Sequence, residues 1–373
     1  MIINNCKMVF LGDIMPGGVL PYQNKYIDDD VLSYLRQFDL RVGTLECGVG
    51  DTYPFDKVKN ADDMSMVFSR NSDLVRLKEM EINIVTLANN HAFDLGLKGF
   101  ENVIIQLDNL GIKYCGAGHN IIEARKPAVV DCKGKKIAFI GCMIKPSWVR
   151  MYHMASETEY GVYQVSIETL EKDIKEAKQN SDYVIVLPHW GEEHKYLQRG
   201  KMKEYAKRIL AAGADSIIGS HPHVINPVVS WNGKKCYFSL GNFLFSDICM
   251  QEPRPMFYPA SKVEMMSLKR MWMYPYRIEE PVVAVWKPRN RIGMMVEMEI
   301  GERIRSRYRL TCLTTDNILR HYNSFQVRLR MKFWALLMHL PYYNFIARVY
   351  NSHFNYLRKV VDKLPAFNVS VEL

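Results

Sequence analysis

The sequence predicts an α/β protein, a sandwich whose functional site lies along one sheet edge. Short apolar segments of strand length alternate with amphipathic segments of helix length along most of the chain. Several of the apolar segments end in Asp, Glu, Asn or His. Ligands of open α/β sheets bind outside the carboxyl ends of the strands. We therefore expect these polar side chains to meet in one site.

The first half of the chain supplies the first group of expected elements. Strands are expected over 7–11, 40–45 and 82–87, near Tyr114, and as a hairpin of 126–131 with 136–142; helices are expected over 29–38, 72–80 and 97–110. Ser72 is suited to cap the second helix, and Lys133-Gly134 is suited to turn the hairpin.

The second half of the chain continues the alternation of strands and helices, and its last part is expected to be helical. Helices are expected over 167–179 and 201–212, strands over 182–187 and 216–218, and hairpins of 224–230 with 235–238 and of 281–286 with 292–300. Asn232-Gly233 is a strong turn signal for the first of these hairpins. Residues 144–162 are expected to be loop-like, and the chain is expected to become helical after Arg309.

Composition and charge indicate one large domain with appendages. With 373 residues and 48% hydrophobic content, the chain can bury a large core. We assign the domain to 1–305, with an insertion or lid at 249–280, and a basic, aromatic-rich helical tail to 306–373. From residue 301 onward there are 12 Lys or Arg and 4 Asp or Glu, whereas the preceding 300 residues carry 37 and 36. The nearly neutral body argues against a nucleic-acid groove, so no nucleic-acid partner is expected.

The eight cysteines are scattered without a C-x-x-C pair, which favours buried free thiols. The N-terminal residues lack an apolar segment of signal-peptide length, and no segment approaches the roughly 20 apolar residues of a membrane span. A reduced, cytoplasmic protein is expected.

The most informative stretch follows the predicted strand 216–218. It places His221 and His223 on one short loop, and imidazole suits zinc, iron, nickel and copper. A His-x-His pair alone is a weak signal. Other strand ends strengthen it with ligand-type residues: Asp13, Glu46, Asn90, His91 and His189. Carboxylate, amide and imidazole groups together are typical of a site for two divalent ions.

Six motifs then occur in order: GDIM, LE, ANNHAFDLG, HWGEE, GSHPHV and SLGNFLF. This series resembles the CapA family of poly-γ-glutamate capsule biosynthesis proteins, also called PgsA, which have a metallophosphatase-like (calcineurin-like phosphoesterase) fold. The resemblance covers about residues 9–245. It implies a four-layer α/β/β/α sandwich of the metallo-dependent phosphatase type, here with a helical C-terminal appendage.

The resemblance also implies a role for each motif residue. One metal would be held by Asp13 and His223, a second by Asn90, His189 and His221, and Glu46 would bridge the two. His91 would be the general acid, and Asp94 would orient it or fix the turn. The remaining polar motif residues, expected to contact substrate or support the ligands, are Asn89, Glu192 and Asn242. The expected cofactor is one or two divalent ions, with Mn, Zn or Fe favoured.

Two departures weaken one metal position. Metallophosphatases usually have Asp-x-His in the first motif, but this chain has Met15 at the third place, and it has Glu46 where a bridging Asp is usual. The sequence therefore also allows a site with one metal ion, or a phosphatase scaffold that has lost its phosphatase chemistry.

Two functions follow. In the first, metal-bound hydroxide attacks a phosphoester or a γ-glutamyl amide, and His91 protonates the leaving group. In the second, the protein is a non-catalytic binding or assembly component. Its cleft holds polyanionic poly-γ-glutamate or a capsule-synthesis partner protein. The intact His91 favours the first function, and Met15 favours the second.

The tail has two interpretations as well. Leu329, Leu336 and Leu340 recur at helical spacing beside Arg328 and Lys332. Such a helix packs on a core or partner protein, or it makes peripheral contact with a membrane surface.

Overall fold

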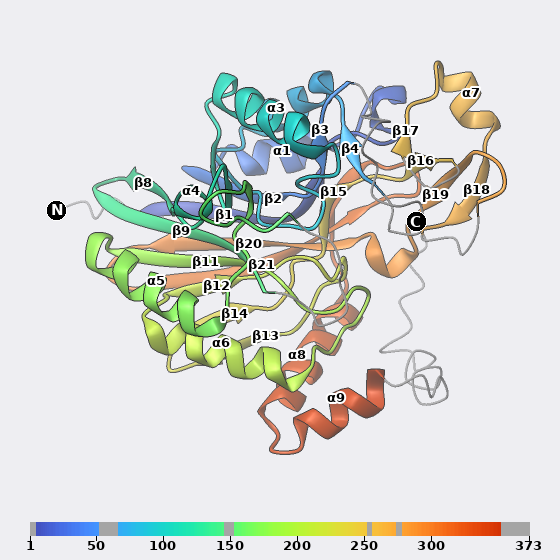
Figure 1. The fold of residues 1–373 in the computed structure, drawn as a ribbon. Helices are drawn as coiled ribbons and strands as arrows, with labels where there is room; N and C mark the ends of the chain where they lie inside the picture. Colours follow the sequence, from blue (N-terminus) through green and yellow to red (C-terminus); the bar gives the residue numbers. More distant parts are fainter. Residues whose placement is uncertain (1–4, 52–65, 145–152, 252–255, 274–277, 352–373) are drawn as a thin grey trace.

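Two β-sheets packed face to face, with helices on both outer sides, form the body of the protein (Figure 1). The structure is a computed structural model that describes residues 5–51, 66–144, 153–251, 256–273 and 278–351. Helices α1 and α3 cover one sheet and helices α5 and α6 cover the other (Figure 1). The predicted four-layer α/β/β/α sandwich is confirmed.

The first sheet has the order β22-β21-β20-β1-β2-β5-β6, with β15 also paired to β1. Its strands are β1 (Cys6–Met15), β2 (Leu40–Leu45), β5 (Ile84–Thr86), β6 (Lys113–Cys115), β15 (Asn242–Phe245), β20 (Ile292–Ile300), β21 (Ile304–Leu313) and β22 (Leu319–Tyr322). β1, β2, β5, β6 and β15 run parallel, so their carboxyl ends reach one edge. The outer helices on this side are α1 (Asp29–Leu35), α2 (Val75–Glu79), α3 (Gly96–Asn109) and α4 (Ile121–Ala124).

The second sheet has the order β13-β14-β12-β11-β9-β8. Its strands are β8 (Ala128–Cys132), β9 (Lys135–Met143), β11 (Tyr183–His189), β12 (Ser216–Ile218), β13 (Val228–Trp231) and β14 (Lys234–Tyr237). Helices α5 (Ile167–Asn180) and α6 (Gly200–Ala212) lie outside it. The predicted hairpins β8–β9 and β13–β14 are confirmed, and Asn232 and Gly233 adopt the positive φ that the second turn requires.

The largest hydrophobic cluster joins the two sheets. Phe10 and Val42 from the first sheet belong to it, as do Phe139 and Ile185 from the second. The rings of Phe10 and Phe139 lie 6.2 Å apart. Fully buried side chains of this size each contribute about 1.5–3 kcal/mol to stability. The interface fixes the sheets, and with them the loops at their edges.

Shorter elements complete the body. They are β3 (Gly48–Val49) paired with β4 (Phe68–Ser69), β7 (Ala117–Gly118) paired with β10 (Gly161–Val162), and 3-10 helices at Leu20–Tyr22, Asn71–Leu74 and Pro288–Asn290. The segment expected to be loop-like at 144–162 contains β10, and residues 145–152 of it lie outside the described residues.

The predicted insertion folds as a small sheet beside the body (Figure 1). The sheet has the order β17-β16-β19-β18, from β16 (Ile248–Met250), β17 (Met256–Phe257), β18 (Lys269–Trp272) and β19 (Val282–Val285), and it carries helix α7 (Lys262–Ser267). The predicted hairpin of 281–286 with 292–300 is wrong. β19 pairs with β16 and β18, whereas β20 pairs with β1 and β21.

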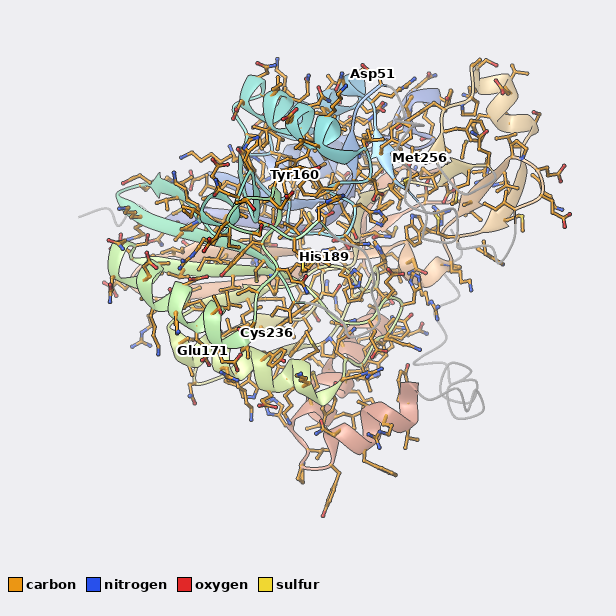
Figure 2. All side chains as sticks on the ribbon, in the orientation of Figure 1. Asp51, Tyr160, Glu171, His189, Cys236 and Met256 are labelled. Carbon is orange, nitrogen blue, oxygen red and sulfur yellow. A yellow bond between two sulfur atoms is a disulfide. The ribbon has the colours of Figure 1, made fainter. Side chains whose placement is uncertain are left out.

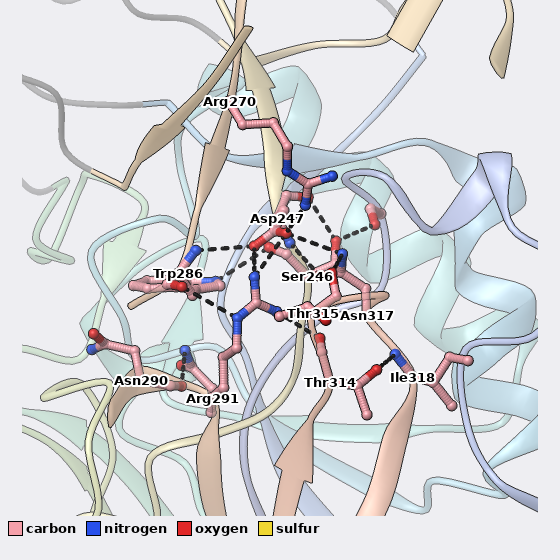
Figure 3. A network of polar contacts seen from close by, with 12 residues as sticks. Ser246, Asp247, Arg270, Trp286, Asn290, Arg291, Thr314, Thr315, Asn317 and Ile318 are labelled. Carbon is pink, nitrogen blue, oxygen red and sulfur yellow. Dashed lines mark hydrogen bonds and ion pairs between the residues drawn. The ribbon is translucent and has the colours of Figure 1, made fainter. Parts of the chain in front are cut away.

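Buried Asp247 anchors this small sheet to the body (Figure 3). Its carboxylate accepts hydrogen bonds from Arg291 at 2.7 and 2.8 Å, from the Trp286 backbone N–H at 3.0 Å and from Asn317 at 3.1 Å. Arg270 of β18 adds an ion pair at 3.2 Å. Both carboxylate oxygens therefore have cationic partners.

The expectation that the chain becomes helical after Arg309 is also wrong. β21 and β22 continue the first sheet to Tyr322, and β21 runs through the predicted division at 305. Inward and outward residues alternate along the first half of β21, which is the pattern of a strand with one solvent face. Helices α8 (Phe325–His339) and α9 (Tyr343–Asn351) follow, and the tail from 352 lies outside the described residues.

Cys6 of β1 and Cys132 of β8 form a disulfide across 126 residues of sequence. The expectation of a fully reduced chain is therefore wrong for this pair, while the other six cysteines are buried free thiols. Among the described residues, no helix combines the length and apolar character needed to cross a membrane.

Candidate metal centre

The six predicted ligand residues meet at the shared edge of the two sheets, and each is at most 5% exposed. Asp13 lies near the end of β1, Glu46 follows β2, and Asn90 lies in the loop after β5. His189 ends β11, and His221 and His223 follow β12. Figure 2 labels His189 near the centre of the molecule, and its side chain is buried.

The ligand atoms form two groups that share one residue. Glu46, His189 and His221 make one group, Asp13, Glu46 and His223 make the other, and the ligand atoms within each group lie within 4.8 Å of one another. Glu46 Oε1 lies 3.3 Å from His189 Nε2 and 3.6 Å from His223 Nε2, and Asp13 Oδ2 lies 3.6 Å from His223 Nδ1. Glu46 is thus in the place of a bridging carboxylate.

The centre contains buried polar atoms without hydrogen-bond partners. They are both carboxylate oxygens of Asp13 and of Glu46, and both ring nitrogens of His221. An unpaired buried polar atom is costly, and a bound cation would supply the missing partner for all of them. The donor set and the unpaired atoms fit a divalent metal ion.

Burial sets the protonation of these groups. It raises the pKa of Asp13 to about 7, and it raises the pKa of Glu46 well above its ordinary value, assisted by the charge of Asp13. Burial lowers the pKa of His221 and of His223 to about 3, and that of His189 well below its ordinary value. The imidazoles are therefore neutral, the form that binds metal, whereas a cation would have to compete with protons for the two carboxyls.

Hydrogen bonds orient the histidines. His189 Nδ1 lies 3.0 Å from Ser220 Oγ, and its Nε2 lies 2.8 Å from Asn90 Oδ1. His223 Nδ1 lies 2.9 Å from Asn242 Oδ1, and Asn242 donates to the Asn290 carbonyl at 3.1 Å. In His189 and His223, Nδ1 is engaged and Nε2 points towards a ligand group, as is usual around protein metal sites.

The backbone approaches closely where the strands converge. The Asp13 N–H donates to the Gly241 carbonyl at 3.0 Å, and a Cβ at Gly12 would lie 1.9 Å from that carbonyl oxygen. Glycine at position 12 is therefore required to bring β1 against the segment before β15. His221 and His223 both have positive φ, at 96° and 52°. Few non-glycine residues adopt this conformation, and it costs about 1–3 kcal/mol at each position.

His91 and Asp94 form a pair beside the ligands. His91 Nδ1 lies 2.6 Å from Asp94 Oδ2, which also accepts the Val67 N–H at 2.7 Å. His91 interacts electrostatically with the ligand imidazoles. Asn89 shapes the turn, because its side chain donates to the Leu45 carbonyl at 2.8 Å and accepts the His91 N–H at 2.9 Å.

The loop after β11 contains the predicted Glu192 and two further residues, Glu193 and His194, that were not predicted from the sequence. Glu192 forms an ion pair with Arg199, whereas neighbouring Glu193 interacts with His91, and burial raises the pKa of Glu193. His194 is partly buried; its ring lies 6.0 Å from that of His223, and Nδ1 lies 2.9 Å from Asn290 Nδ2. No local signal in the sequence marks Glu193 or His194, because the orientation of this loop depends on positive φ at Gly191 and His194.

Met15 is fully buried in the hydrophobic cluster on the helix-covered side of the first sheet. The group around Asp13 therefore has Asp13, Glu46 and His223 as its ligands among the described residues. A further grouping, Cys6, Cys132 and Asp39, has its sulfurs joined in the disulfide and is not a candidate metal site.

Comparison with known proteins identifies relatives of the chain. Residues 7–247 match the family model described as bacterial capsule synthesis protein PGA_cap. The chain is 31% identical over 245 residues to the PGA biosynthesis protein CapA of Bacillus subtilis, covering 63% of this chain and 62% of the relative. It is 30% identical over 249 residues to the capsule biosynthesis protein CapA of Bacillus anthracis, covering 64% and 59%. The chain thus matches somewhat under two thirds of each relative's length.

Solved structures are more distant. A putative 5'-nucleotidase from Staphylococcus aureus aligns with a TM-score of 0.45 at 13% identity, over 88% of this chain and 58% of that one. A hypothetical protein from Thermus thermophilus aligns with a TM-score of 0.42 at 13% identity, over 81% and 98%.

Proposed function

Because this chain belongs to the family of bacterial capsule synthesis proteins, we propose that it is a metal-dependent hydrolase acting in poly-γ-glutamate capsule production, on a phosphoester or a γ-glutamyl amide. One observation carries the proposal: two buried ligand groups share Glu46, and the carboxylate oxygens of Asp13 and Glu46 and the ring nitrogens of His221 lack hydrogen-bond partners within the protein. Such an arrangement is costly unless a cation binds.

The protein's part in the reaction is to hold the ions and to move a proton. One or two divalent ions, with Mn, Zn or Fe favoured by the donors, would polarise water and the scissile group when bound. Asp13, Glu46 and His223 would hold one ion. Asn90, His189 and His221, with Glu46 shared, would hold the other. Supporting contacts from Ser220 and Asn242 keep the Nε2 atoms aimed inward.

His91 is the proposed general acid. Asp94 engages Nδ1, which fixes the tautomer and leaves Nε2 to carry a proton to the leaving group. Glu193, whose pKa is raised by burial, interacts with this imidazole and is a proposed partner in the transfer. A binding site without turnover would have no need of an oriented imidazole.

The alternative is a non-catalytic component that binds polyglutamate or a partner of capsule synthesis. Met15 favours it, because the residue packs in the core and leaves the group around Asp13 with fewer ligands than the Asp-x-His pattern provides. In this case the same cleft would hold the polyanion or the partner without hydrolysis.

The test begins with metal content. The purified protein is loaded with Mn²⁺ or Zn²⁺, desalted and analysed by elemental mass spectrometry beside His221→Ala and Asp13→Ala, with exposed His119→Ala as the matched control. We expect one or two ions in the wild type and the control, and a loss in both ligand variants. A metal-free wild type would overturn the hydrolase and would favour the non-catalytic component.

Turnover then separates the two functions. A generic phosphodiester and a γ-glutamyl peptide are offered to the loaded wild type and to His91→Gln. Hydrolysis that falls by about 10²–10⁴-fold in a variant that keeps its metal supports the hydrolase. A metal-loaded wild type that turns over neither compound but retains polyglutamate on a binding column supports the alternative.

A further inference from the structure

Helices α8 and α9 carry apolar residues on two opposite sides. The inner side of α8, with Val327, Met331, Trp334 and Met338, is buried and packs against the second sheet. The outer side also exposes large apolar side chains. The α8–α9 surface consists of these outer residues, Phe325, Leu329, Leu336, Leu340, Tyr342 and Phe345. Both helices lie at one extremity of the body, beyond α6 and β13 (Figure 1).

The exposure is concentrated here. Half of the large hydrophobic side chains that are exposed in the described part of the chain lie between Phe325 and Phe345. Phe325 is 78% exposed, Tyr342 75% and Phe345 67%. Scattered apolar residues are normal on protein surfaces, whereas a cluster of long aromatic and aliphatic side chains marks a binding surface.

The charge of this region has one sign. Between residues 317 and 361 the sequence contains seven Lys or Arg and no Asp or Glu. Lys332 is exposed on the same helical stripe, between Leu329 and Leu336, and Arg348 is exposed on α9. Lys203 and Lys207 of α6 lie nearby, with the Lys203 ammonium 5.4 Å from the ring centre of Tyr343 in α9. The surface is apolar at its centre and basic around it.

We propose that the α8–α9 surface binds an anionic lipid bilayer, with the two helices lying in the plane of the interface. Apolar side chains would enter the acyl boundary while lysine and arginine reach the phosphates. The position of Lys332 favours lipid over a protein partner: a protein interface would have to pair this ammonium with an acidic group, whereas at a bilayer its long stem can extend to the headgroups. The inference does not depend on the proposed hydrolase.

The test is co-sedimentation of the full chain with two kinds of vesicles, phosphatidylcholine alone and an equal mixture of phosphatidylcholine and phosphatidylglycerol. We expect binding to the anionic vesicles that weakens as salt is raised. The double variant Leu336→Ser, Phe345→Ser should bind about tenfold more weakly. Its control, Ile105→Ser with Ile122→Ser, removes two equally exposed apolar residues elsewhere and should bind as the wild type does.

A second pair of variants tests the charge. Lys332→Gln with Arg348→Gln should weaken binding about tenfold or more at low salt, since each cation near an anionic surface contributes roughly fivefold. Lys98→Gln with Lys172→Gln, two exposed lysines on α3 and α5, is the matched control. Circular dichroism shows whether each variant is folded.

Two results would overturn the proposal. One is failure of the wild type to sediment with anionic vesicles. If ultracentrifugation then reveals a dimer that the apolar variant dissociates, the surface binds a second copy of the chain instead. The other is lipid binding that neither surface variant reduces.

Discussion

Two clusters of buried charged groups lie close together in this protein, and they differ in whether their atoms have partners. Asp247 is fully buried, yet each of its oxygens meets arginine or amide donors (Figure 3). Asp13 and Glu46 are equally buried, and their oxygens have no hydrogen-bond partner. Burial alone therefore does not identify a functional carboxylate. The absence of a partner does, because only a ligand can then offset the cost of burial.

The two clusters are also in contact. Trp286 donates its backbone N–H to Asp247, and its ring lies 5.1 Å from that of His223. Asn290, next to Arg291, donates to the His223 carbonyl at 2.9 Å. The paired cluster around Asp247 thus packs against the unpaired cluster of Asp13 and Glu46. Substitutions in the two clusters should change stability in different ways.

The largest expected effect is in the paired cluster. Asp247→Ala leaves the Arg291 guanidinium buried without its counter-charge and should lower the free energy of unfolding by about 3–5 kcal/mol. Urea denaturation measures it, and adding Arg291→Met should recover part of the loss. A loss under about 1 kcal/mol would show that the pair is not the anchor described here.

The pH dependence of metal binding is the next largest effect. A proton on Asp13, whose pKa burial raises to about 7, competes with the cation, so affinity should rise with pH by about tenfold per unit for each proton displaced. It should level off once both carboxyls are ionised. The ligand histidines, with pKa values lowered by burial, are neutral throughout this range. Mn²⁺ titration calorimetry at several pH values measures the slope, and a flat profile between pH 5 and 7 would contradict the account.

Removing a carboxylate from the unpaired cluster should act in the opposite direction from Asp247→Ala. Burial and the charge of Asp13 raise the pKa of Glu46, so ionising it in the folded metal-free protein is unfavourable. The cost increases as pH rises above the ordinary pKa of a glutamate. Glu46→Gln should therefore stabilise the metal-free protein at pH 8 by about 1 kcal/mol or more. Thermal unfolding in a chelator tests this, and a destabilised variant would mean that Glu46 has partners after all.

The smallest expected effect concerns support of a ligand. Asn242→Ala removes the hydrogen bond to His223 Nδ1 and should weaken metal binding about tenfold with little change in fold. Asn102→Ala, which removes hydrogen bonds to the Val49 carbonyl and to Asn71 rather than to a candidate ligand, is the control. Equal affinities in the two variants would show that the histidine needs no such orientation.

The convergence of the candidate ligand residues was predictable because it depends on local sequence and on one topological rule. Asp13 and Glu46 end neighbouring parallel strands, and such strands end at a common edge. Asn242 was predictable as a supporting residue, and it is paired in register with Asp13. The roles of these residues in metal binding and catalysis are predictions that the proposed experiments address.

The elements that could not be predicted depend on distant partners. β19 is followed by a turn and then by β20, which is locally the pattern of a hairpin. β19 instead pairs with β16 and β18 in the small sheet, where Asp247 bonds the Trp286 N–H and Arg270. The disulfide partners are separated by 126 residues, and neither has a local signal. β21 is different: its alternation was present in the sequence and identifies a strand.

The positive φ of His221 and His223 has a consequence for how such a centre would be lost over evolutionary time. Glycine would relieve the backbone at either position, so mutational drift without selection for imidazole should favour glycine there, with a gain in stability. A descendant of this protein that no longer uses metal should therefore show glycines in this loop, and a lineage that keeps both histidines continues to bear a folding cost that only ligand binding explains.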